Sequence, residues 1–172
     1  LGFWVGIPWA LKMPLGHLVD LIDRKKHYLV FVGAGLIALS LGIMYLLIMH
    51  TPYMGSFLKI ETWFIISALL SPVGYVSQDV VADSMTVEAV PSTDDQGNEY
   101  SVQQIKTMHM TMQSLGRVAI IGGFVLVSLV NVVMFAGVSD LGEAEKIEIY
   151  GKIYMYALII PLVSISGVFL GM

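Results

Sequence analysis

The segment YLVFVGAGLIALSLGIMYLLIM, residues 28–49, carries no charged side chain. A helix needs roughly 20 mostly apolar residues to cross the hydrocarbon core of a membrane, so this segment predicts a membrane-spanning helix. Outward from it, further apolar runs predict spans at about residues 1–15 (truncated), 63–87, 104–136 and 153–172. Five spans, the first of them incomplete, indicate an all-α integral membrane protein.

The composition of the chain supports the same class. Of its 172 residues, 56% are hydrophobic and 13% are charged, and the mean hydropathy is +0.79. Soluble domains carry about 25% charged residues, so the polar surface is too small for a soluble protein. The net charge of -4 gives no sign of nucleic-acid binding, and the lack of cysteine excludes a thiol nucleophile or a cysteine metal site.

No sequence pattern typical of a catalytic or cofactor site is present. There is no nucleophile–base pair, no phosphate-binding glycine loop and no HExxH motif. The segment MHMTMQ, residues 108–113, contains Met and His, which soft metals prefer. On a helix, however, Met110 faces away from Met108 and Met112, which favours ordinary packing. We therefore predict neither an enzyme nor a bound cofactor or metal.

Both ends of the sequence lie inside apolar runs. Leu1 opens LGFWVGIPWALKMPLG, and Met172 closes the last run. The residues near Leu1 contain neither the basic segment nor the cleavage site of a signal peptide, so we do not predict one here. We interpret the chain as a fragment whose ends fall within membrane helices.

Basic residues orient the spans, because Lys and Arg are concentrated in cytoplasmic loops. The spans are joined by connections at about 16–27, 50–62, 88–102 and 137–152. Most basic residues lie on the side of the first and third connections: Lys12, Arg24, Lys25, Lys26, Lys106 and Arg117. The other side has Lys59, Lys146 and Lys152. Connections 16–27 and 88–102 are therefore predicted to be cytoplasmic, and the second contains STDDQGNEY, which is typical of a flexible loop.

Two spans carry polar residues along one helical face, where spacings of three and four residues align side chains. In the span at 63–87 they are Tyr75, Asp79, Asp83 and Thr86. In the span at 104–136 and its polar lead they are Gln103, Lys106, Met110, Gln113 and Arg117. A polar face of this length is unfavourable against lipid, so we expect both faces to point into the protein. Pro72 and Gly74 are expected to bend or loosen the first of these helices.

The two polar faces are predicted to meet in an ion pair. Counted from the outer ends of the spans, Asp79 and Arg117 differ in depth by about one helical turn. An uncompensated charge near hydrocarbon costs at least about 2.5–3.5 kcal/mol, which favours pairing of Arg117 with Asp79 or Asp83. The pair is either a lock that holds the bundle together or part of a gate or substrate site. Lys12 either reaches the same cavity or extends toward the lipid headgroups.

Small residues also recur at helical spacing, at Ala34, Ala38 and Gly42. Such a face lets two membrane helices approach closely. Glycine is also frequent in membrane helices generally, so both interpretations of this pattern stand.

The segment GHLVDLIDRKK, residues 16–26, resembles the signature between helices 2 and 3 of the major facilitator superfamily. That signature has a Gly, three further residues, an Asp, a basic or variable position, a second Gly and a basic cluster. The matching positions are Gly16, Asp20, Arg24 and Lys25. Leu21 and Asp23 depart from it, because they stand where the family has a basic residue and the second Gly.

A narrower resemblance, to the folate–biopterin transporter branch, rests on PWALKMPLGHLVD (8–20) and SQDVVADSMTVE (77–88). The branch has a Lys-x-Pro–Gly–Asp segment at helix 2 and a Gln-Asp-x-x-x-Asp segment ending in Glu at helix 4. The matching residues are Lys12, Pro14, Gly16, Asp20, Gln78, Asp79, Asp83 and Glu88. The segment SLGRVAIIGG around Arg117 also looks like helix 5 of that branch.

The resemblance implies a twelve-helix bundle of two six-helix halves. Residues 1–172 would supply about helices 2–6 of the N-terminal half, and the C-terminal half would lie outside this chain. The implied function is secondary active transport of a small organic solute of folate or pterin type, by alternating access and coupled to protons. The implied location is a plasma membrane of the bacterial inner-membrane type. The alternative is a non-transporting membrane scaffold or assembly factor with the same fold.

The resemblance also implies roles for individual residues. Lys12 and Arg117 would attract a carboxylate, and Tyr75 would stack on a ring. Asp79 or Asp83 would carry the coupling proton. The remaining implied substrate or gating residues are Gly16, Asp20, Arg24 and Gln78.

Overall fold

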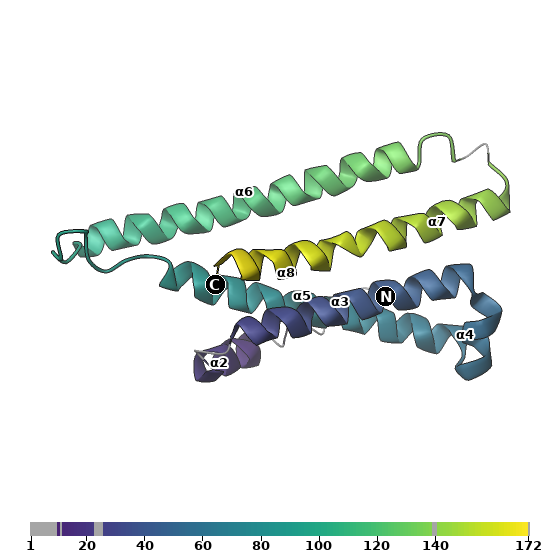
Figure 1. Ribbon diagram of the computed structural model, residues 1–172, viewed down its shortest axis with the longest axis horizontal. Coiled ribbons are helices and arrows are strands. Elements are labelled where there is room, and N and C mark those ends of the chain that lie inside the picture. Colours follow the sequence, from purple (N-terminus) through teal and green to yellow (C-terminus); the bar gives the residue numbers. More distant parts are fainter. Residues whose placement is uncertain (1–9, 11, 23–25, 139–140, 172) are drawn as a thin grey trace. The chain divides into compact units, whose positions relative to one another are not determined.

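The computed structural model describes residues 10, 12–22, 26–138 and 141–171, apart from the side chains of Leu18 and Asp20. Its helices are α2 (Lys12–Ile22), α3 (His27–Met49), α4 (Thr51–Phe57), α5 (Ile60–Glu88), α6 (Val102–Met134), α7 (Glu143–Ala157) and α8 (Ile159–Gly171) (Figure 1). Two compact units divide the chain: Leu1–Val81 with Gly137–Met172, and Ala82–Ala136. The described residues form no sheet, and their one strand-like pairing is an isolated bridge between Thr93 and Glu99.

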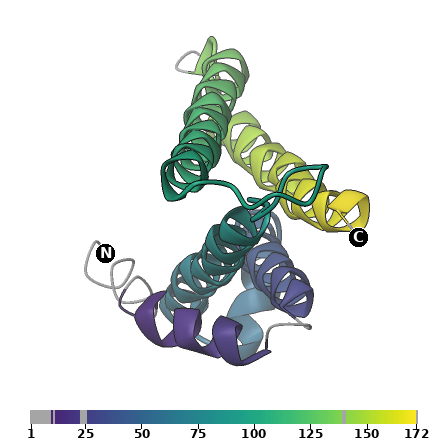
Figure 2. The same ribbon diagram turned by 90° about the vertical axis from the view of Figure 1, so that its left-hand side faces the viewer.

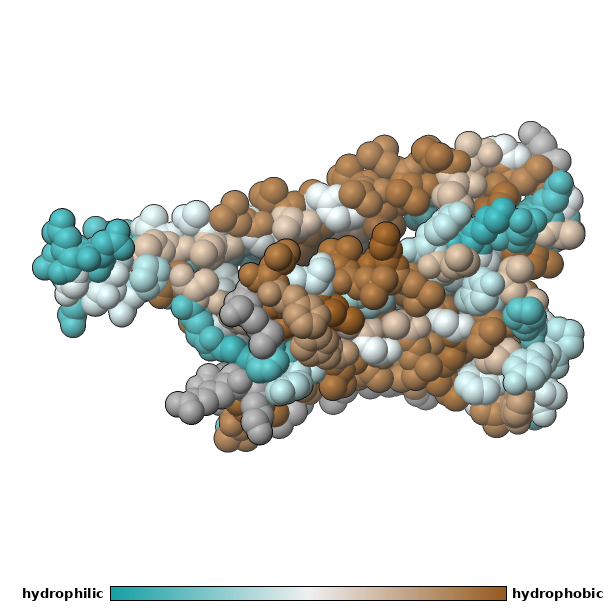
Figure 3. All heavy atoms as spheres, viewed as in Figure 1, coloured by the Kyte–Doolittle hydropathy of each residue, from teal (hydrophilic) through white to brown (hydrophobic). Residues whose placement is uncertain are grey.

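Among the described residues, four helical segments are long and apolar enough to cross a membrane: His27–Met49, Ile60–Glu88, Val102–Met134 and Glu143–Leu170. Most of the fifth predicted span, at about residues 1–15, lies outside the described residues. Hydrophobic residues cover the middle of these helices, and hydrophilic residues gather toward their ends (Figure 3). The prediction of an all-α membrane protein is therefore confirmed at this level.

Helices extend into three of the connections that the sequence predicted, so these connections are shorter than expected. Helix α2 continues to Ile22, so Gly16 and Asp20 lie in a helix and not in the loop predicted at 16–27. Helix α7 begins at Glu143 and occupies most of the connection predicted at 137–152. Helix α4 lies within the connection predicted at 50–62. These polar segments remain helical because helix formation needs no apolar surroundings, only satisfied backbone hydrogen bonds.

The first unit is built around α3, which packs against α4, α7 and α8. Helix α2 lies across the direction of α3 and α5 (Figure 2). Valine side chains from α2, α3, α5 and α8 form one buried cluster: Val19, Val30, Val76, Val80, Val81 and Val168. A second cluster joins Ile43 and Leu47 of α3 to Met54 of α4, with Trp63 of α5 against it.

A close contact between α3 and α5 lies at two glycines. A Cβ built on Gly33 would stand 2.7 Å from the carbonyl oxygen of Gly74, and one built on Gly74 would stand 2.5 Å from that of Gly33. Farther along the same pair of helices, the hydroxyls of Ser40 and Ser67 lie 2.9 Å apart, and each donates to the other residue's carbonyl oxygen. Small residues and interhelical hydrogen bonds of this kind join helices in lipid, where hydrophobic burial cannot.

The small-residue face predicted on residues 34–42 is only partly used in this contact. Ala34 is completely buried, whereas a Cβ on Gly42 would meet nothing within 4 Å. Gly33, one position away from the predicted line, makes the tight approach instead. Helix α5 runs unbroken through Pro72 and Gly74, and the bend or loosening expected from these two residues stays a prediction.

In the second unit, the segment expected to be flexible folds into a hydrogen-bonded turn before α6. The Asp94 carboxylate accepts hydrogen bonds from the backbone N–H groups of Gln96 and Asn98, at 2.9 and 2.8 Å. Gly97 has a φ of +84°, a conformation that glycine adopts without strain. The Ser101 hydroxyl and the Gln104 side chain then form a capping box that starts α6.

Acidification is expected to open this turn. The backbone N–H and the side chain of Asn98 hold the pKa of Asp94 below its usual value. A lowered pKa in the folded turn means that the ionised carboxylate stabilises it at pH values above the unfolded pKa of about 3.9. That stabilisation is lost as the pH falls through the lower pKa of the folded turn. The protection of the Gln96 and Asn98 amides against hydrogen exchange, measured against an unstructured peptide at the same pH, should fall there. The variant Asp94→Asn should remove this pH dependence, and Asp95→Asn should retain it.

Candidate functional site

An ion pair joins α2 to α5 in the first unit. The Lys12 ammonium lies 2.7 Å from a carboxylate oxygen of Asp79 and donates a hydrogen bond to it. Lys12 is the first residue of α2, and Asp79 lies within the apolar segment of α5. The side chains are 41% and 20% exposed, respectively, so the acid is the more enclosed partner. A charge in such surroundings is stable only with a partner, and the cation supplied by α2 meets that need.

The cation beside Asp79 differs from the one predicted. Depth and charge in the sequence predicted a pair between Arg117 and Asp79 or Asp83, whereas Lys12 is bound to Asp79. Arg117 lies on α6, in the second unit. Its pairing with either acid stays a prediction.

Gln78, next to Asp79, links three helices by hydrogen bonds. Its side-chain nitrogen donates to the carbonyl oxygen of Val30 on α3, at 3.2 Å. Its side-chain oxygen lies 3.4 Å from the hydroxyl of Ser164 on α8, which donates to it. Gln78 was selected from the sequence, but Ser164 was not. One serine in an apolar run has no spacing pattern that would have marked it.

Gly16 brings α2 close to α5. A Cβ on this residue would lie 3.9 Å from a methyl group of Val80, which is ordinary van der Waals contact. The position therefore has room for an alanine but adjoins the same valine cluster that holds the two helices together. The Asp20 side chain and all of Arg24 lie outside the described residues.

Tyr75 and Asp83 lie on α5, one turn before and one turn after Asp79. Both are exposed. Together with Asp79 they continue the polar face that the sequence spacing predicted on this helix. Tyr75 is 42% exposed.

Within the ranges that the structure describes, no three His, Cys, Asp or Glu side chains come together as metal ligands. The described side chains of this region include the Lys12–Asp79 ion pair, the Gln78 amide that bridges helices and the exposed ring of Tyr75. Such a group can bind a charged or planar solute, and it can also fix the positions of helices.

The chain matches no protein-family model, no curated protein and no solved structure.

Proposed function

We propose that the chain is part of a secondary active transporter that moves a small organic solute by alternating access. The observation that supports this most strongly is the Lys12–Asp79 ion pair, which joins two helices at a membrane-spanning segment. Ionisable residues within membrane spans usually mark substrate or ion pathways. A second support is the resemblance of Lys12, Gln78 and Asp79 to the folate–biopterin branch of the major facilitator superfamily.

In this proposal, the ion pair holds α2 against α5 in one conformation of the transporter. A solute carboxylate that enters the site competes with Asp79 for Lys12 and so frees the acid. In this proposal, Asp79 carries the coupling proton once the solute occupies its cation. Competition of this kind couples solute binding to proton binding. It also releases α2 for the change between inward-open and outward-open states.

A second candidate function, that of a membrane scaffold, is favoured by the contact between α3 and α5. Gly33 against Gly74 and Ser40 against Ser67 form a tight, buried seam that would resist movement of these two helices. A scaffold would need such seams and no solute pathway. In a transporter, the same seam would keep α3 and α5 together as one rigid part of a moving half.

An uptake assay separates the two candidates. In proteoliposomes, the full-length protein is expected to accumulate a labelled folate or pterin when a proton gradient is imposed. Collapse of the gradient should abolish accumulation. Asp79→Asn should also lower accumulation, whereas its matched control Asp95→Asn, which removes one acid from an exposed loop position, should leave uptake unchanged. Folded protein that moves none of these solutes with or without the gradient would favour the scaffold.

The proposed orientation places residues 88–102 in the cytoplasm and residues 50–62 on the opposite side. Because the chain has no cysteine, single cysteines introduced at Ser56 and Ser92 can report the side of each segment. Both residues are exposed. An impermeant thiol reagent added outside intact cells is expected to label the cysteine at position 56 and not the one at position 92. Equal labelling of both would contradict an odd number of spans between them.

A further inference from the structure

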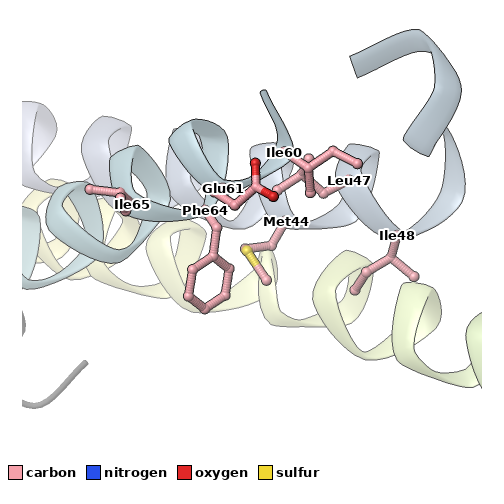
Figure 4. A pocket seen from close by; sticks show the side chains of 7 residues that line it. All are labelled: Met44, Leu47, Ile48, Ile60, Glu61, Phe64 and Ile65. Carbon is pink, nitrogen blue, oxygen red and sulfur yellow. The ribbon is translucent and has the colours of Figure 1, made fainter. Parts of the chain in front are cut away.

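An apolar groove lies between α3 and α5 near the start of α5, away from the Lys12–Asp79 pair. Its volume is about 480 Å³, within the range of about 300–1,000 Å³ that is usual for small-molecule sites. Met44, Leu47 and Ile48 line it from α3, and Ile60, Phe64 and Ile65 line it from α5. The seventh lining residue, Glu61, carries the only charged atoms among these side chains (Figure 4).

Glu61 lies in the first turn of α5 and is exposed. Among the residues that the structure describes, no hydrogen bond or ion pair engages its carboxylate. Lys59 stands two positions earlier, where its carbonyl oxygen accepts the N–H groups of Thr62 and Trp63. The mouth of the groove thus has an anion in its lining and a cation on the adjoining turn.

The neighbouring helix α4 indicates the depth of this mouth in a membrane. Tyr53 and Phe57 of α4 are each 62% exposed, and their rings meet edge to face with centroids 5.2 Å apart. Exposed aromatic rings at the end of a span are typical of the boundary between hydrocarbon and headgroups. The groove therefore extends from the headgroup level along the hydrocarbon-facing surface.

We propose that this groove binds a phospholipid whose headgroup carries a primary ammonium group. One acyl chain fills the space between Met44, Leu47 and Phe64, and the ammonium binds Glu61. An ammonium offers three N–H donors to a carboxylate, and hydrogen bonds between charged groups are stronger than neutral ones. In this proposal, Lys59, two positions before Glu61, supplies the cation for the lipid phosphate. A zwitterionic headgroup thus finds both of its charges matched, whereas an anionic headgroup places its net charge beside Glu61.

Fluorescence quenching tests this proposal in nanodiscs. Trp63 is a suitable reporter, because it packs in the cluster that contains the groove residue Leu47, and its indole N–H is held by the carbonyl oxygen of Met54 at 3.1 Å. Trp4→Phe and Trp9→Phe leave it as the sole tryptophan of residues 1–172, and any tryptophan elsewhere in the full-length protein is also replaced with Phe. The discs contain phosphatidylcholine and a varied fraction of one lipid with brominated acyl chains. That lipid is phosphatidylethanolamine, phosphatidylcholine or phosphatidylglycerol.

Brominated phosphatidylethanolamine is expected to quench Trp63 at a mole fraction about three- to fivefold lower than the other two lipids, the preference that one exposed ion pair supports. Glu61→Gln should abolish the difference, whereas the matched control Glu99→Gln, an exposed acid on the loop, should retain it. Ile65→Phe, which fills the groove, should weaken quenching by all three lipids, and Ile160→Phe on α8 should not.

Three outcomes would overturn the proposal. Equal quenching by all three lipids would mean that the groove binds acyl chains without selectivity for the headgroup. A preference that survives Glu61→Gln would place headgroup recognition elsewhere. No quenching by any lipid would mean that another polypeptide segment or a second copy of the chain covers the groove.

Discussion

Replacing Lys12 with Gln is expected to lower the free energy of unfolding by about 1–3 kcal/mol, because it leaves the enclosed Asp79 carboxylate without its cation. Asp79→Asn should cost a similar amount. The double variant should cost less than the sum of the two single changes, because neighbouring groups couple by about 0.5–3 kcal/mol. Stability in detergent and solute uptake in proteoliposomes would both be measured over this double-mutant cycle.

The two measurements distinguish a working ion pair from a structural one. Coupling in both stability and uptake indicates a pair that takes part in transport, whereas coupling in stability alone indicates a lock. The pair between Lys152 and Glu148 is the matched control, because it lies within one helix with both side chains about half exposed. A cycle on that pair should show much weaker coupling, because water and salt screen an exposed ion pair. Strict additivity at Lys12 and Asp79 would contradict the contact between them.

Gly33→Ala is expected to destabilise the first unit by about 1–3 kcal/mol, the usual cost of overpacking a tight contact. The new methyl group would stand 2.7 Å from the carbonyl oxygen of Gly74 and from a side-chain carbon of Gln78. The helices must separate to accept it. Because Gln78 also bonds to Val30 and Ser164, the strain should extend into the candidate site. Thermal unfolding in detergent measures the loss.

Gly42→Ala is the matched control on the same helix. A Cβ at Gly42 meets nothing within 4 Å, so the substitution should be neutral or stabilise α3 by up to about 1 kcal/mol, the usual gain of alanine over glycine in a helix. Equal stability of the Gly33 and Gly42 variants would contradict the close approach of α3 to α5.

Helix existence was predictable because it depends on local composition. The uncharged segment 28–49 became α3, His27–Met49, with its boundaries displaced by a single residue at the start. The apolar runs after it became α5, α6 and the pair α7 and α8. The errors occurred at polar flanks, where run length says nothing about where a helix ends. Residues such as Glu145, Lys146 and Glu148 are good helix formers, and they extend α7 well before its apolar part.

The polar face on α5 was also legible in the sequence, because a spacing of four residues places Tyr75, Asp79 and Asp83 on one side of any helix. The partner of Asp79 was not. By charge and depth, either Lys12 or Arg117 could be the partner of Asp79. Only the path of α2 across α5 brings the Lys12 ammonium to 2.7 Å from the Asp79 carboxylate. The contact between Gly33 and Gly74 was also only partly predictable from the sequence. Periodicity showed that α3 has small residues, but the rotation of α3 against α5 selected Gly33 and left Gly42 open. Local patterns determine which side chains share a helical face, whereas partners depend on the packing of segments distant in sequence, which no local pattern records.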